Sequence, residues 1–378
     1  MISPGEFYKI LSANGINFFT GVPDSLLKDF CSYISDNIPE DRHIINSNEG
    51  SAVALASGHY LATGKPSLVY MQNSGLGNSV NPLLSLADNE VYGIPMLLLI
   101  GWRGEPGKKD EPQHIKQGRV LTGMLEAMEI PFEKINGMTV RIDELVENVC
   151  RKIINSNQPH ALLVSSGTFS EYISNFSLKS EESNKYPLQR EEAVKIILNN
   201  LTDDEIIVST TGMISREVFE YRKNNNQGHE KDFLTVGSMG HCSQIALGIS
   251  LIKKDRQVFI LDGDGAVIMH MGSLAVTADK GGENFKHIIL NNGAHDSVGG
   301  QPTLAFKINL SKIAESCGYR QVITAQTSEE IKEKILELKK CKGPSLLEIK
   351  ISKGFTNIPG RPDISPADNK KNFIKYLS

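Results

Sequence analysis

The chain has none of the sequence features that mark membrane, secreted or nucleic-acid-binding proteins. No apolar run approaches the about 18 residues that a membrane-spanning helix needs. The first residues, Met1 to Glu6, lack the basic and apolar regions of a targeting peptide. The formal net charge is only −4, and basic residues do not cluster. We therefore expect a protein that binds neither nucleic acids nor membranes.

Cysteine is also scarce. The chain has five cysteines, an odd number, and they are scattered without a Cys-x-x-Cys pair. A disulfide framework or a structural zinc site needs paired or closely spaced cysteines. We therefore expect free thiols in a reducing compartment, and a cytoplasmic protein.

The length of the chain predicts more than one domain. Its 378 residues, 40% hydrophobic and 22% charged, have a globular composition but exceed what one ordinary core organises. A polar stretch, residues 169–186, is the one linker-like segment. We predict a first domain at 1–170, a linker at 171–187, a second domain at 188–351 and a C-terminal tail at 352–378.

The strongest motif consists of two short apolar runs that end in polar residues. Residues 257–261 lead into Asp262-Gly263-Asp264-Gly265-Ala266, and residues 286–290 lead into Asn291-Asn292. Short β-branched runs bounded by glycine are typical of buried parallel strands, and residues from about 269 to 282 leave room for one crossover helix. Adjacent parallel strands would bring Asp264 and Asn292 to the same edge of the sheet, where open α/β sheets bind ligands.

The residues at this edge favour a magnesium–diphosphate site. Asp264 offers a carboxylate, Asn292 an amide oxygen, and the chain beyond can turn the carbonyl of Ala294 to the same point. Three oxygen ligands suit Mg²⁺, which is usually completed by phosphates and water. Gly263 and Gly265 let a diphosphate approach the backbone, where a helix N-terminus favours the anion. The alternative is an ordinary strand–helix–strand unit with a glycine-rich turn.

This Gly-Asp-Gly and Asn-Asn pattern resembles the signature of thiamine-diphosphate-dependent enzymes. A second region, Asn48-Glu49 before a helix rich in small residues and Ser74-Gly75-Leu76-Gly77-Asn78 after the next strand, is similar to their pyrimidine-binding domain. The resemblance covers essentially the whole chain. It implies the α/β fold class, with two doubly wound parallel-sheet domains, pyrimidine-binding and then diphosphate-binding, and no middle domain.

The resemblance also implies roles for individual residues. Glu49 would be the buried, protonated glutamate that hydrogen-bonds the cofactor aminopyrimidine, although an acidic residue in a first helical turn is common for other reasons. Gly237 would offer a carbonyl to the pyrimidine amino group, and Met239 would wedge the cofactor into a bent form. The alternative for Met239 is a core methionine. Further expected cofactor-binding residues are Thr211, Gly212, Met213, Gly263, Gly265 and Ala266.

The absence of a middle domain makes the chain similar to the compact decarboxylases of this family, which act on phosphonopyruvate or sulfopyruvate. The implied reaction is decarboxylation of 3-phosphonopyruvate to 2-phosphonoacetaldehyde and CO₂, a lyase step of phosphonate biosynthesis. Sulfopyruvate decarboxylation, and another decarboxylase or carboligase activity, stay open. A protein that binds thiamine diphosphate for regulation without catalysis is an alternative of a different class.

Most candidate substrate-binding residues lie in one charged loop. The charged segment from Trp102 to His114 is expected to be an active-site loop, although its length also fits a solvated surface loop. His114 and His295 are candidates to protonate the carbon that becomes the aldehyde, because a histidine titrates near neutral pH; each could equally be structural. Expected anion-binding residues are Ser25, Arg103, Lys108, Lys109 and Arg361.

The family resemblance finally implies an assembly. Sites of this family usually lie between the pyrimidine domain of one subunit and the diphosphate domain of another. We therefore expect a homo-oligomer with active sites between subunits, loaded with thiamine diphosphate and Mg²⁺.

Overall fold

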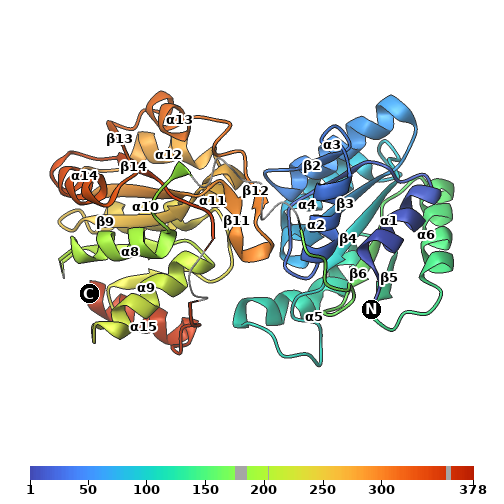
Figure 1. Cartoon of the computed structure of the whole chain (residues 1–378), viewed down its shortest axis with the longest axis horizontal. Coiled ribbons are helices and arrows are strands. Elements are labelled where there is room, and N and C mark those ends of the chain that lie inside the picture. Colours follow the sequence, from blue (N-terminus) through green and yellow to red (C-terminus); the bar gives the residue numbers. More distant parts are fainter. Residues whose placement is uncertain (175–184, 203, 355–358) are drawn as a thin grey trace. The chain divides into compact units, whose positions relative to one another are not determined.

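The apolar runs of the sequence form the strands of two parallel sheets in a computed structural model of the chain (Figure 1). The chain divides into two units, Met1–Lys179 and Ser180–Ser378. The structure describes residues 1–174, 185–202, 204–354 and 359–378. Each unit has six parallel strands between helices, and the described residues form no middle domain. The predicted α/β class with two doubly wound sheets is confirmed.

The first unit has the strand order β2-β1-β3-β4-β6-β5. Its strands are β1 (Phe19–Gly21), β2 (His43–Ile45), β3 (Ser67–Gln72), β4 (Met96–Gly101), β5 (Phe132–Ile135) and β6 (His160–Val164). Its helices are α1 (Pro4–Ala13), α2 (Lys28–Asn37), α3 (Glu49–Thr63), η1 (Asn73–Gly75), α4 (Leu76–Pro82), η2 (Leu83–Ala87), α5 (Pro112–Ala127) and α6 (Ile142–Ser156).

The central strand β4 is apolar along its length because helices cover both faces of the sheet. Leu97 and Leu99 pack into the cluster formed with α1, α2 and α6. Leu98 and Ile100 pack into the cluster formed with α3, α4 and α5. Successive strand residues point to opposite faces, so a sheet covered on both faces buries them all.

The second unit has the strand order β13-β14-β10-β9-β7-β8. Its sheet strands are β7 (Ile206–Ser209), β8 (Asp232–Leu234), β9 (Val258–Gly263), β10 (Phe285–Asn291), β13 (Gln321–Ala325) and β14 (Ser345–Lys350), with a small ribbon of β11 (Ala294–His295) and β12 (Gln301–Pro302). Its helices are α8 (Arg190–Asn199), α9 (Met213–Asn224), α10 (Cys242–Ile252), α11 (Asp264–Met269), α12 (Ser273–Lys280), η4 (Asp296–Val298), α13 (Leu310–Cys317), α14 (Ser328–Lys340) and α15 (Pro366–Leu377).

Both sheets have the same topology. Counted along the chain within each sheet, the strands lie in the order second, first, third, fourth, sixth, fifth. The direction of winding therefore changes between β1 and β3 in the first sheet and between β7 and β9 in the second. Ligands of open α/β sheets bind beyond the carboxyl ends of the strands at such a point. The expectation that the two domains share a doubly wound topology is confirmed.

The connection between β9 and β10 differs from the single crossover helix that we expected. It contains two short helices, α11 and α12, and α11 begins at Asp264 directly after the strand. His270 ends α11 in a non-helical conformation, so the chain turns before α12 begins. Because α11 begins at Asp264 and not near residue 269, Asp264 lies in the first turn of a helix.

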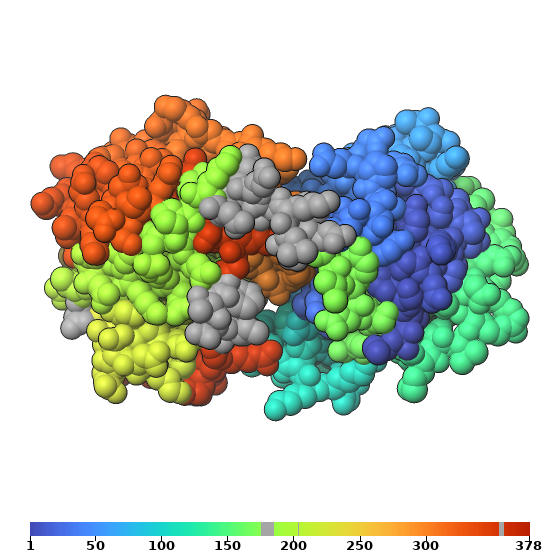
Figure 2. All heavy atoms as spheres, in the orientation of Figure 1, coloured from blue at the N-terminus to red at the C-terminus, as the bar shows by residue number. Residues whose placement is uncertain are grey.

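Part of the predicted tail belongs to the second unit. Helix α15 buries Phe373 in the core cluster that includes Val258 and Leu346. In Figure 2 this red segment adjoins the yellow α9, where Lys223 pairs with Asp363 at 2.6 Å. Of the predicted linker, residues 175–184 lie outside the described residues, as do residues 355–358 of the tail.

Two further expectations concern membranes and cysteines. None of the described helices is both long and apolar enough to cross a membrane. The five thiols, all within described segments, are free: Cys31, Cys150, Cys242, Cys317 and Cys341.

Candidate functional site

Asp264 and Asn292 meet at the carboxyl ends of β9 and β10. The two strands are adjacent and parallel, with Leu290 opposite Gly263. Asp264 is 3% exposed, and its carboxylate accepts hydrogen bonds from the main chain of Asn292 and from the Thr303 hydroxyl. The structure thus brings together the two residues that the sequence spacing paired. Thr303 was missed, although it ends the Gly299-Gly300-Gln301-Pro302-Thr303 segment that follows Asn292.

The electrostatics of Asp264 fit a cation site. Burial raises the pKa of this carboxyl to about 7, although hydrogen bonds from Thr303 and Asn292 oppose the rise. A divalent cation beside it would favour the charged form. The described residues contain no cluster of three or more His, Cys, Asp or Glu side chains that could hold a metal. A site here would therefore combine one carboxylate with amide and carbonyl oxygens, ligands that suit Mg²⁺.

The main chain of Ala294 faces the same place. Ala294 lies opposite Pro302 in the β11–β12 ribbon, and Thr303 N donates to Gly293 O at 2.9 Å. This register makes Ala294 and Pro302 a non-hydrogen-bonded pair, so the N–H and C=O of Ala294 point away from β12. Its N–H meets Asn292 Oδ1 at 3.1 Å. In a non-hydrogen-bonded pair the carbonyl lies on the same side as the N–H, so the Ala294 carbonyl is the candidate for the third oxygen ligand.

Gly265 packs closely against the side chain of His295. A Cβ added at Gly265 would lie 3.0 Å from Cε1 of His295, so the missing side chain makes room for that imidazole. A Cβ at Gly263 would make only ordinary contacts, 3.8 Å from Ile214 and 4.0 Å from Thr210. Helix α11 has six residues, so its dipole is smaller than that of a full helix. The backbone of Gly263 is therefore the more open of the two glycines.

The turn after β7 and the segment before α10 contact each other. Thr211 Oγ1 accepts a hydrogen bond from Gly237 N at 2.9 Å. Gly212 has φ 98°, a conformation that favours glycine, and Met213 begins α9. These cofactor-binding candidates therefore lie beside the switch point between β7 and β9.

Met239 lies in a tight turn against α11. Gly237, Ser238 and Gly240 all have positive φ angles, 70°, 47° and 83°. A Cβ at Gly240 would lie 2.8 Å from the carbonyl oxygen of Ala266, so the turn packs directly on α11. Met239 is half-buried and belongs to none of the described core clusters. This exposure disfavours the alternative of a core methionine.

His295 is a poor proton donor at neutral pH. Desolvation lowers the pKa of its imidazole to about 4, although the negative charge of Asp296 opposes the shift. The ring is therefore neutral at pH 7. Its packing against Gly265 places it next to Asp264.

In the first unit, Glu49 is enclosed where β2 leads into α3. Asn48 caps α3 by accepting a hydrogen bond from Ser51 N at 2.9 Å. Glu49 is 5% exposed, and Asn78 Nδ2 donates to its Oε2 at 2.8 Å. Burial raises the pKa of this carboxyl, although the bond from Asn78 opposes the rise. An acidic residue that only stabilised the helix start would be solvated and charged.

Ser25 and Arg103 come together at the carboxyl ends of β1 and β4. Arg103 Nη1 donates to Ser25 Oγ at 2.8 Å, and its Nε donates to Asp110 Oδ2 at 2.8 Å. A second guanidinium nitrogen also bonds Asp110. Three of the five N–H donors of Arg103 are thus already used, so a substrate anion would bind the remaining two or displace Asp110.

Asp24 and Gln72 complete this group and were missed by sequence reasoning. Asp24 is fully buried, and Gln72 Nε2 donates to its Oδ1 at 2.7 Å. A Cβ at Gly101 would lie 2.1 Å from Asp24 Oδ2, so the carboxyl lies directly on the end of β4. The signal was the Gly-Val-Pro-Asp-Ser turn directly after β1, which places a carboxyl at a switch point.

The other predicted substrate residues lie at the surface or on a helix. Lys108 is exposed and pairs with Glu105 at 2.7 Å, and Lys109 is exposed. Arg361 is exposed, next to Gly360, whose amide donates to Glu220 of α9 at 3.3 Å. His114 is buried within the first turn of α5 and not in the loop, because the helix begins at Pro112.

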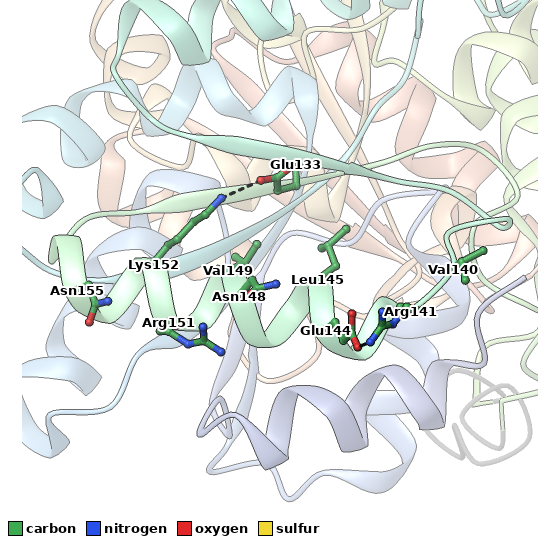
Figure 3. Close-up of a pocket in the computed structure, with 10 residues that line it drawn as sticks. All are labelled: Glu133, Val140, Arg141, Glu144, Leu145, Asn148, Val149, Arg151, Lys152 and Asn155. Carbon is green, nitrogen blue, oxygen red and sulfur yellow. Dashed lines mark hydrogen bonds and ion pairs between the residues drawn. The ribbon is translucent and has the colours of Figure 1, made fainter.

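The first unit also has a surface groove (Figure 3). It runs along α6 beside the edge strand β5, where Lys152 pairs with Glu133 at 3.0 Å. Its lining contains none of the predicted site residues.

Each of the two units contains a region that matches the model of a known protein family. Residues 6–125 match the model of the thiamine pyrophosphate enzyme N-terminal TPP binding domain. Residues 210–349 match the C-terminal TPP binding domain of the same enzymes.

Three curated relatives match the chain along its whole length. A phosphonopyruvate decarboxylase of Streptomyces viridochromogenes is 30% identical over 389 residues, covering 100% of this chain and 96% of that protein. A phosphonopyruvate decarboxylase of Streptomyces hygroscopicus is 32% identical, with 100% and 94% covered. A sulfopyruvate decarboxylase of Methanosarcina acetivorans is 30% identical, with 100% and 98% covered.

Proposed function

Because the chain belongs to the family of thiamine pyrophosphate enzymes, we propose that it is a carboxy-lyase that converts 3-phosphonopyruvate to 2-phosphonoacetaldehyde and CO₂. The full-length similarity to two phosphonopyruvate decarboxylases carries this proposal. In the reaction the bond between the carboxylate and the C2 carbon breaks, CO₂ leaves, and a proton takes its place on that carbon. The buried carboxyl of Glu49 supports catalysis over regulatory binding alone.

Thiamine diphosphate, when bound, supplies a sink for the electron pair that CO₂ leaves behind. Asp264, Asn292 and the carbonyl of Ala294 would hold Mg²⁺, and the contact between them supports this assignment. The residues that would hold the organic cofactor surround the ends of β7 and β9: Thr211, Gly212, Met213, Gly237, Met239, Gly263, Gly265 and Ala266.

Glu49 would hold and exchange a proton with the cofactor pyrimidine. Its raised pKa favours a protonated carboxyl, which can donate a hydrogen bond to a ring nitrogen. Asn78 fixes Oε2 and leaves Oε1 as the oxygen that exchanges the proton. Burial of Glu49 excludes water that would otherwise compete for it.

Ser25 and Arg103 would orient the substrate anion, with Lys108, Lys109 and Arg361 as more distant candidates. Ser25 and Arg103 are already linked, so a bound anion would meet a hydroxyl and a cation together. Of the two histidines proposed as proton donors, His295 would be neutral at pH 7 because its pKa is about 4. His114 is the other candidate.

The wider setting of the enzyme is part of the proposal. We propose Mg²⁺ as the metal, a homo-oligomer with active sites between subunits, and a role in phosphonate biosynthesis. A cytoplasmic location is supported by the five free cysteines. The predicted domain division, with a pyrimidine-binding and a diphosphate-binding half, is supported by the two matching family models.

Sulfopyruvate decarboxylation is the second candidate. The Methanosarcina acetivorans relative supports it at similar identity and coverage. Both substrates are 2-oxo acids with an anion on C3, so an anion pocket alone does not separate them.

A single comparative assay tests the function. The chain is incubated with thiamine diphosphate, Mg²⁺ and either substrate, and the products are identified by mass spectrometry. We expect phosphonoacetaldehyde and CO₂, with a higher kcat/KM for phosphonopyruvate. A higher value for sulfopyruvate would favour the second candidate, and ligated products would show a carboligase. Cofactor binding without turnover of either substrate would favour the regulatory alternative.

A further inference from the structure

The amide of Asn292 is held at both of its ends. Its Nδ2 donates to Asp296 Oδ2 at 2.7 Å, and its Oδ1 accepts from Ala294 N at 3.1 Å. A main-chain N–H only donates, so the group that faces Ala294 must be the oxygen. If the amide were turned over, two donors would face each other on the Ala294 side. The oxygen of Asn292 is therefore fixed on the side where Ala294 offers its carbonyl.

Asp296 is built to act only as an acceptor. Its Oδ2 receives hydrogen bonds from Asn292, from Arg190 Nη1 at 3.0 Å and from Gly354 N at 3.2 Å. An oxygen that accepts three donors has no proton to give, so it selects the nitrogen end of the Asn292 amide.

Arg190 holds Asp296 in place from α8. The arginine is 5% exposed, and its Nε also donates to both oxygens of Glu217, at 3.0 and 3.1 Å. A buried guanidinium held by two carboxylates has few alternative positions. The chain Arg190–Asp296–Asn292 thus connects a rigid helix to the proposed metal ligand.

We propose that Asp296 and Arg190 are positioning residues that select which end of the Asn292 amide faces the metal. The inference rests on the proposed function, because it needs Mg²⁺ at Asp264 and Asn292. An amide nitrogen is not a ligand for Mg²⁺, so a reversed Asn292 would remove one of three protein oxygens. Partners of metal ligands fix ligand orientation in this way.

The test is the affinity for Mg²⁺, measured by calorimetry on the full chain stripped of divalent cations, with saturating thiamine diphosphate. In Asp296→Asn the new amide can accept or donate, so position 296 no longer selects the orientation of Asn292 and only the Ala294 N–H still favours the oxygen on its side. We expect Mg²⁺ affinity to fall about 10-fold or more. Arg190→Gln, which leaves Asp296 without its cation, should lose affinity in the same direction.

A swapped pair provides the rescue. The double variant Asn292→Asp with Asp296→Asn retains one acid and one amide, with the hydrogen bond reversed. A carboxylate at position 292 offers an oxygen in either orientation. We therefore expect Mg²⁺ affinity to return to within a few-fold of the wild type. A double variant as weak as Asp296→Asn would overturn the inference.

A second buried pair is the matched control. Arg222 Nε and Asp232 Oδ2 lie 3.0 Å apart in the same unit, with side chains 2% and 0% exposed. Asp232→Asn should lower Tm and leave Mg²⁺ affinity unchanged. Unchanged Mg²⁺ affinity in Asp296→Asn, or an equal loss of Mg²⁺ affinity in Asp232→Asn, would overturn this inference but not the proposed metal site. A wild-type chain that binds no Mg²⁺ would overturn the proposed metal site, and this inference with it.

Discussion

The carboxyl of Glu49 packs directly on the backbone of Gly75. A Cβ added at Gly75 would lie 2.3 Å from Glu49 Oε1 and 2.5 Å from its Cδ. Gly75 has φ −73° and ψ −16°, which any residue can adopt. Glycine is therefore required here by the space that the carboxyl occupies and not by backbone strain.

Gly75→Ala should displace the Glu49 carboxyl. We expect kcat to fall about 100-fold, since a shift of about 1 Å in a catalytic group has effects of that size. The control is Gly77→Ala, on the exposed side of α4, where an added Cβ meets nothing within 4 Å. Steady-state kinetics of both variants would check this, and equal activity in the two would show that Gly75 does not position Glu49.

Glu49→Gln should separate catalysis from cofactor binding. Glutamine can still accept the hydrogen bond from Asn78 but has no exchangeable carboxyl proton. We expect kcat to fall about 10²–10⁴-fold, while the affinity for thiamine diphosphate with Mg²⁺ changes little. Turnover and calorimetric titration measure the two quantities. Full activity in this variant would contradict the proposed mechanism.

Arg103→Met tests the substrate anion pocket. Loss of a charge-assisted hydrogen bond predicts a fall in kcat/KM of about 10–100-fold for phosphonopyruvate. Lys116→Met, an exposed cation on α5, should leave kcat/KM unchanged. Asp110→Asn distinguishes substrate binding by Arg103 from support of the loop, because it keeps the cation of Arg103 and weakens the ion pair that holds it. An equal loss in Asp110→Asn and Arg103→Met would show that Arg103 acts through the loop.

His43 should make the chain sensitive to acid. Desolvation lowers the pKa of this buried imidazole to about 4, and its Nε2 lies 2.9 Å from the Tyr70 hydroxyl. The unfolded state takes up a proton near pH 6.5 and the folded state does not, so stability is lost as pH falls below about 6.5. The loss at pH 5 is about 2 kcal/mol.

His43→Gln should therefore reduce the fall in unfolding free energy between pH 7 and pH 5 by that amount. Denaturant titrations at the two pH values measure it. Tyr70→Phe is the control, because it removes the hydroxyl and keeps the titrating group. The same pH dependence in His43→Gln and the wild type would rule out this source of acid sensitivity.

The sequence by itself determined the strands and the spacing of the motif at their ends. The apolar runs before Asp264 and Asn292 are local patterns, and two adjacent buried strands of a parallel sheet end at one edge. The family resemblance added Glu49, whose position at the start of α3 follows from the strand before it. These features depend on residues close together in the chain, so a one-dimensional pattern carries them.

Only the tertiary structure decided which side chains surround each group. Arg190 reaches Asp296 across 106 positions of the chain, and Thr303 reaches Asp264 across 39. No periodicity encodes such pairs, because they depend on how helices and loops pack at the sheet edge. The filling of the space over Gly265 by His295 and the enclosure of Glu49 by Gly75 arise in the same way. They are close-packing contacts between atoms distant in the chain, which form only when the chain folds.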